Sequence, residues 1–184
     1  MTADESGPAG GAGRQRGASP PPWPDITAAY DRVAADYAAA FAAELAAKPL
    51  DCELLDRFAA AVAGRGPVWD VGCGPAGHVT RYLSDRGADV SGADLSPGVV
   101  QVASQRQPDL AFRVADMCAL PAAAGSLAAA VAFYSVIHLP RDRIPVALAE
   151  FRRVLAAGGS LLIRPSIRPS ACTSGPSPAD AGLG

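Results

Sequence analysis

Between residues 67 and 163 of the 184-residue chain, short apolar runs alternate with longer segments of helical periodicity. The first run, Val68–Val71, leads through three glycines into a helical segment at 77–86. A strand that breaks into a glycine loop and continues as a helix is a platform on which backbone groups bind a ligand. This order of elements restricts the chain to folds in which helices connect parallel strands.

The alternation predicts an α/β fold, a Rossmann-like doubly wound parallel sheet with helices on both faces. Ser96 and Pro97 are the N-cap and first residue of the second of its helices, which ends before Pro108. Gly158 and Gly159 turn the chain into the last strand. We expect strands at 68–71, 88–93, 110–114, 128–134 and 160–163, and helices at 77–86, 97–107 and 141–156.

Regions of different composition flank this core. Residues 1–24 are rich in Gly, Pro, Ala and Ser and are expected to be disordered, as is the proline-containing tail at 164–184. Residues 25–66 carry two amphipathic patterns, predicting helices at 25–47 and 51–62. The expected domain therefore covers 25–163, with N-terminal helices at 25–66 and the α/β core at 67–163.

Charge and cysteine usage narrow the functional classes. The formal net charge of −2 gives no basic field for nucleic acid. The uncharged stretch 117–140 is broken by Pro121 and Gly125, so we expect a loop and a buried strand there, not a membrane span. The four cysteines lack metal-ligand spacing and no secretory signal is visible, which predicts free thiols, no metal site and a cytoplasmic location.

Three acids follow three successive strands and point to the ligand. Gly72-x-Gly74-x-x-Gly77, with Asp94 about 20 residues on, matches the dinucleotide fingerprint, so an NAD(P)-binding oxidoreductase is one alternative. Asp70, however, would repel a pyrophosphate and favour a cation. With Asp116, the acids suit a ligand that combines an ammonium, a sulfonium, a ribose diol and an adenine amine, which describes S-adenosylmethionine.

The segments at 30–37, 68–77, 90–97, 112–117 and 148–163 resemble, in order, the motifs of class I S-adenosylmethionine-dependent methyltransferases of the small methyltransferase-domain type. The resemblance implies strand order 3-2-1-4-5, S-adenosylmethionine as cofactor and a small-molecule methyl acceptor. In this family a helix and an antiparallel hairpin follow strand five. The chain after Ile163 lacks them and is expected to be truncated there, so a catalytically impaired S-adenosylmethionine-binding protein is a second alternative.

The resemblance also assigns roles. Asp94 is expected to accept hydrogen bonds from the ribose hydroxyls, Asp116 to accept one from the adenine amine with Met117 on the ring, and Asp70 to favour the amino-acid end. The structural alternatives are a tight turn for the glycines, a helix-start acid for Asp94 and a loop acid for Asp116. The expected cofactor-binding residues are Tyr30, Asp70, Gly72, Gly74, Gly77, Asp94, Leu95, Asp116, Met117 and Tyr134.

Catalytic residues are harder to identify from the sequence than cofactor-binding residues. Methyl transfer to an electron-rich acceptor is a direct displacement that needs alignment and exclusion of water more than an acid–base pair. Tyr134 and His138, which follow strand four, are the candidates for a base or for orienting the acceptor. The alternative for His138 is a packing or capping role before the helix at 141–156.

Overall fold

The computed structural model describes residues 44–165. The segments expected to be disordered are 1–24 and 164–184. Residues 1–24 and 166–184 lie outside the described residues, whereas residues 164 and 165 of the expected tail are described. Most of the predicted helix at 25–47, including Tyr30, also lies outside the described residues. The end of that helix falls inside them as a short 3-10 helix, η1, Glu44–Ala47.

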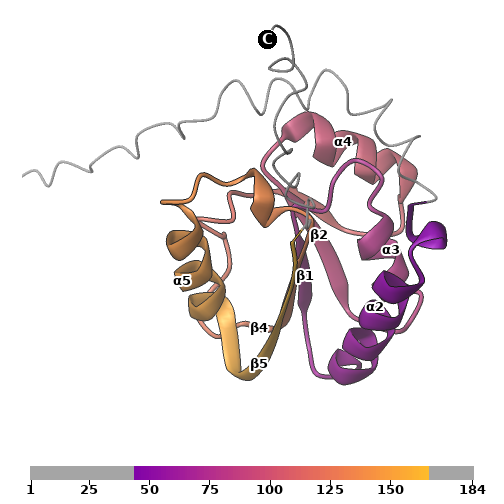
Figure 1. Cartoon of the computed structure of the whole chain (residues 1–184), viewed down its shortest axis with the longest axis horizontal. Coiled ribbons are helices and arrows are strands. Elements are labelled where there is room, and N and C mark those ends of the chain that lie inside the picture. Colours follow the sequence, from indigo (N-terminus) through magenta and orange to yellow (C-terminus); the bar gives the residue numbers. More distant parts are fainter. Residues whose placement is uncertain (1–43, 166–184) are drawn as a thin grey trace, which may run out of the picture.

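The sheet has five strands, all parallel, in the order β3-β2-β1-β4-β5 (Figure 1). Both the α/β class and the predicted strand order are confirmed. The order reverses direction beside β1, so the carboxyl ends of β1 and β4 flank the crevice where such sheets bind ligands. The strands are β1 Val68–Val71, β2 Val90–Asp94, β3 Phe112–Val114, β4 Leu127–Phe133 and β5 Leu155–Arg164.

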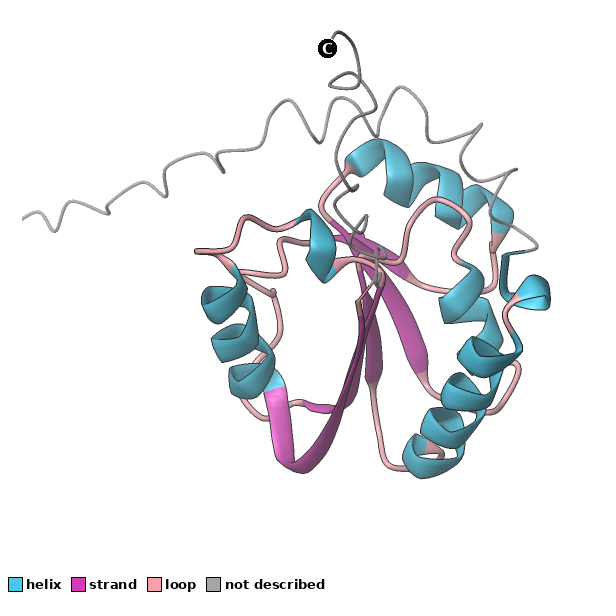
Figure 2. Ribbon diagram, in the orientation of Figure 1, coloured by secondary structure: helices cyan, strands magenta, loops and turns pink. Residues whose placement is uncertain are grey.

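Helices cover both faces of this sheet. On one side lie α2 (Pro49–Val62), α3 (His78–Ser84) and α4 (Pro97–Arg106), and on the other lies α5 (Ile144–Val154) (Figures 1 and 2). A one-turn 3-10 helix, η2 (Val136–His138), follows β4. No helix within residues 44–165 is both long and apolar enough to cross a membrane.

Two apolar clusters fill the space between the sheet and the helices. Val68 and Val131 pack toward α2 and α3, whereas their neighbours Trp69 and Ala130 pack toward Phe151 of α5. Successive residues of a strand point to opposite faces, so a strand covered on both sides must be apolar throughout. β1 and β4 are accordingly buried at every position, including the acid at Asp70.

The predicted start of α4 is confirmed. The Ser96 hydroxyl accepts a hydrogen bond of 3.0 Å from the backbone N–H of Val99, and Pro97 takes the first helical position. The helix ends at Arg106, before Pro108. Ser96 lies two positions after the last residue of β2, so the cap fixes the chain just beyond this strand. The end of β2 forms part of the candidate site.

The segment after β4 differs from expectation. α5 begins at Ile144 instead of residue 141, because Pro145 lacks the N–H that any later helical position needs. β5 begins at Leu155 instead of residue 160. In the pairing register, two steps along β4 correspond to five steps along β5. Residues 156–159 therefore form a bulge in β5, in which Gly158 has a φ of 73°. β5 also includes Arg164, which lay outside the predicted domain.

Candidate functional site

The loop between β1 and α3 contains three left-handed glycines with different neighbours. A Cβ on Gly72 would overlap the side chain of Ser135, and one on Gly77 would lie 2.9 Å from the Phe112 ring. A Cβ on Gly74 would meet no atom of the described residues within 4 Å. Gly72 and Gly77 therefore allow close packing, while Gly74 keeps open the space that a ligand could approach at backbone level.

Asp70 lies beneath this loop with 0% of its surface exposed. Its Oδ2 accepts a hydrogen bond of 2.7 Å from the Thr80 hydroxyl of α3. Its Oδ1 has no hydrogen-bond partner among residues 44–165. Burial raises the pKa of this carboxyl to about 7. A buried carboxylate with an unused oxygen is costly unless a donor or a cation meets it.

Asp94, the last residue of β2, holds the loop from the other side. Its Oδ2 accepts from the backbone N–H of Gly74 at 3.2 Å, and its Oδ1 accepts from that of Ser96 at 3.1 Å. Each carboxylate oxygen has a second lone pair, which suits a pair of ligand hydroxyls. Leu95 follows it and is half-buried.

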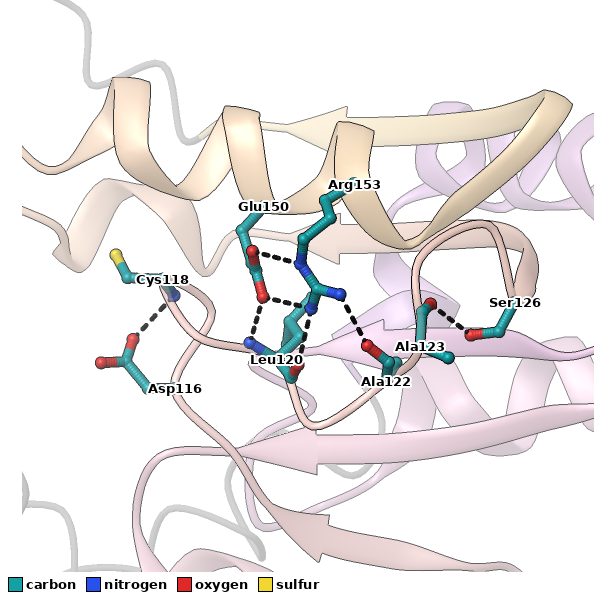
Figure 3. Close-up of polar contacts among 8 residues, drawn as sticks. All are labelled: Asp116, Cys118, Leu120, Ala122, Ala123, Ser126, Glu150 and Arg153. Atoms are coloured by element: carbon teal, nitrogen blue, oxygen red, sulfur yellow. Dashed lines mark hydrogen bonds and ion pairs between the residues drawn. The ribbon is translucent and has the colours of Figure 1, made fainter. Parts of the chain in front are cut away.

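Asp116 follows β3 and is held in a tight turn. Its Oδ1 accepts a hydrogen bond of 2.8 Å from the N–H of Cys118 (Figure 3). Met117 packs against the core on the α5 side. One carboxylate oxygen is thus committed to the turn, and the other retains the capacity to accept a hydrogen bond from an amine.

The loop that follows Asp116 is fastened to α5 by an ion pair. Glu150 accepts a hydrogen bond of 2.8 Å from the Leu120 N–H, and Arg153 donates to the carbonyls of Leu120 and Ala122 at 2.9 and 2.8 Å (Figure 3). The two side chains also pair with each other at 2.6 Å, and Arg153 holds the pKa of Glu150 below its usual value.

Tyr134, directly after β4, has a φ of 58° and is the one non-glycine residue among those described with a left-handed backbone. Its hydroxyl donates to Asp51 Oδ2 at 2.5 Å. Burial and the Asp51 carboxylate raise the pKa of the phenol, so it acts as a donor and not as a base. His138 of η2 is exposed, and partial desolvation lowers the pKa of its imidazole.

Asp51 is a site residue that the sequence analysis missed. It is 3% exposed, and its second oxygen accepts from Arg164 Nε at 2.9 Å. Both oxygens therefore have partners, in contrast with Asp70. A signal was present, because Asp51 shares the buried helix face of Leu55 and Phe58, where an acid needs a partner. Ser135 and Thr80 were also missed, since their partners are distant or lie across the loop.

Together, the acids occupy one edge of the sheet. Asp70, Asp94 and Asp116 stand at the carboxyl ends of β1, β2 and β3, which are neighbours in the sheet. The unused Oδ1 of Asp70 and the open space at Gly74 suit a ligand that carries a cation and approaches the backbone closely. The residues present therefore fit S-adenosylmethionine better than a pyrophosphate. Tyr30 lies outside the described residues.

Comparisons with known proteins identify the family to which the described core is similar. Residues 69–163 match the family model described as a methyltransferase domain. A malonyl-acyl-carrier-protein O-methyltransferase of Serratia marcescens is 34% identical over 93 residues, which are 50% of this chain and 35% of that protein. A demethylmenaquinone methyltransferase of Renibacterium salmoninarum is 34% identical over 96 residues, 52% of this chain and 39% of that protein. The chain thus spans little more than a third of the length of these relatives.

A solved structure gives the same result. The TehB-like S-adenosylmethionine-dependent methyltransferase of Corynebacterium glutamicum superposes with a TM-score of 0.51 at 28% sequence identity. The match covers 67% of this chain and 72% of that one.

Proposed function

Because this chain belongs to the methyltransferase-domain family, we propose that it transfers a methyl group from S-adenosylmethionine to a small molecule. The observation that carries the proposal is Asp70, a fully buried carboxylate with one unused oxygen beneath a glycine loop. The matched relatives include proteins named for a malonyl-acyl-carrier protein and for demethylmenaquinone. Since these acceptors differ, we propose only the class of acceptor, a small molecule with a nucleophilic atom.

Each acid would take one part of the cofactor. Asp70 would favour the cationic amino-acid end, Asp94 would accept hydrogen bonds from the ribose hydroxyls, and Asp116 would accept one from the adenine amine beside Met117. Gly74 would leave room for close approach. When bound, S-adenosylmethionine supplies a methyl carbon activated by its sulfonium.

The protein's own residues have a limited chemical task. A lone pair of the acceptor forms the new bond to the methyl carbon as the carbon–sulfur bond breaks, and the acceptor then loses any proton it carries. His138 is our candidate for receiving that proton, because its lowered pKa keeps the imidazole neutral near pH 7. Tyr134 is unsuited to this role, since its hydroxyl proton is held by Asp51.

The test uses the full chain and two ligands. Calorimetric titration with S-adenosylmethionine should show binding, and NAD should bind at least about tenfold more weakly. Preferential binding of NAD would contradict the proposal and favour the oxidoreductase alternative. Release of labelled methyl groups to a panel of small carboxylic acids, phenols and amines then separates the enzyme from a protein that only binds the cofactor.

A further inference from the structure

Asp51, Tyr134 and Arg164 join three parts of the chain that are far apart in sequence. Tyr134 and Asp51 are separated by 83 positions, and Arg164 and Asp51 by 113. The backbone N–H of Tyr134 also donates to the Arg164 carbonyl at 2.7 Å. The cluster therefore ties the start of α2 to the ends of β4 and β5.

The backbone of Tyr134 is strained, and the cluster holds it in that state. A left-handed conformation is unfavourable for a non-glycine residue. A hydrogen bond to a charged group is among the stronger hydrogen bonds in a protein, so the bond to Asp51 offsets this cost. The Lys48 ammonium lies 4.4 Å from the centroid of the Tyr134 ring. The Phe133 ring packs against it in a T-shaped arrangement, with the two centroids 5.0 Å apart, and both contacts hold the ring further.

The strained backbone aims the next residue at the ligand loop. Ser135 is 6% exposed, and its hydroxyl donates to the Val71 carbonyl at 2.7 Å. Its Cβ fills the space that a side chain on Gly72 would need. If Tyr134 relaxed to an extended φ, Ser135 would turn away from both contacts and the loop would lose its support on the β4 side.

We propose that Asp51, Tyr134 and Arg164 are positioning residues that act through Ser135 to hold the Gly72–Gly77 loop in the shape that binds the cofactor. The inference rests on the proposed function, because the loop is the proposed cofactor loop. It assigns to a partly buried network outside the three acids a share of the affinity for the cofactor. The raised pKa of Tyr134 supports it, since the phenol keeps the proton that it donates to Asp51.

The chain offers a matched control. Tyr82 of α3 also donates to an aspartate of α2, Asp56, at 2.9 Å, but this pair is exposed and has no contact with Ser135. Tyr82→Phe and Tyr134→Phe thus remove the same chemical group from the same kind of bond. A variant that only loosens α2 would behave alike at both positions.

The experiment measures the dissociation constant of S-adenosylhomocysteine by calorimetry, well below the melting temperature of every variant. Tyr134→Phe is expected to raise it roughly three- to tenfold, and Tyr82→Phe to leave it unchanged. Asp51→Asn keeps an oxygen acceptor for the phenol but loses the acceptor for Arg164, so it should raise the dissociation constant by about threefold, less than Tyr134→Phe does. Equal affinity in Tyr134→Phe and the wild type, or equal losses in both tyrosine variants, would overturn the inference. A wild-type chain that does not bind would overturn the proposed function as well.

Discussion

Asp70 and Asp51 are aspartates buried almost equally, at 0% and 3% exposure, but their surroundings differ in kind. Asp51 meets Tyr134 and Arg164, so both its oxygens are satisfied by the protein. Asp70 meets only Thr80 and keeps an oxygen that no described residue uses. Burial alone therefore does not mark a binding residue. What distinguishes Asp70 is its unsatisfied oxygen, which is costly unless a donor or a cation meets it, and its proposed role in binding rests on this oxygen.

The largest expected effect comes from the loop that connects the two regions. Gly72→Ala should lower the free energy of unfolding by about 3 kcal/mol, because its Cβ would overlap Ser135 on a left-handed backbone. Gly74→Ala should cost only about 1 kcal/mol, since its Cβ meets no described atom, yet weaken cofactor binding at least about tenfold. Urea denaturation and calorimetric titration check the pair. Equal losses of stability in the two variants would contradict the distinction between Gly72, which allows close packing, and Gly74, which leaves room for the ligand.

The pH dependence of stability sharpens the contrast between the aspartates. The folded pKa of Asp70, about 7, lies above its unfolded value of about 3.9. The folded state therefore holds the proton more tightly, and the stability that this gives is lost as pH rises from about 4 through 7. Asp70→Asn should consequently melt higher than the wild type at about pH 8, with little difference at pH 4. A lower melting temperature of the variant at pH 8 would contradict this.

The smallest effect concerns the loop after Asp116, which the ion pair of Glu150 and Arg153 holds in place. Arg153→Ala removes two hydrogen bonds to loop carbonyls and should lower the free energy of unfolding by about 1 kcal/mol. It should also speed hydrogen exchange at the Leu120 amide, whose acceptor is Glu150. The neighbouring exposed Arg152→Ala is the control. Unchanged exchange at Leu120 in Arg153→Ala would show that the ion pair does not order this loop.

The sequence predicted the parts of this structure that local patterns encode. The alternating apolar runs led to the correct α/β class with a parallel sheet, and Ser96 with Pro97 marked a true helix start. The strand order followed from the resemblance to the methyltransferase family. The bulge at 156–159 was missed, because Gly158 and Gly159 signal a turn equally well outside a strand and within one.

Part of the candidate site could likewise be predicted from the sequence, and part of it could not. Asp70 and Asp94 lie at the carboxyl ends of strands and Asp116 lies just beyond one, so their meeting at one edge of the sheet could be predicted from the fold class alone. The partners of Asp51 could not, since Arg164 lies 113 positions away and beyond the predicted domain boundary. The left-handed backbone of Tyr134 has no local sequence signal, because contacts with other elements impose it.

The most direct test makes the same isosteric change at both aspartates and measures two quantities for each variant. The account predicts that Asp70→Asn weakens binding of S-adenosylmethionine at least about tenfold and raises the melting temperature at about pH 8. It predicts that Asp51→Asn, which disturbs only the support of the loop, weakens binding by only about threefold and lowers the melting temperature. Wild-type affinity in Asp70→Asn, or equal losses of affinity in the two variants, would contradict the claim that the unsatisfied carboxylate is the binding residue.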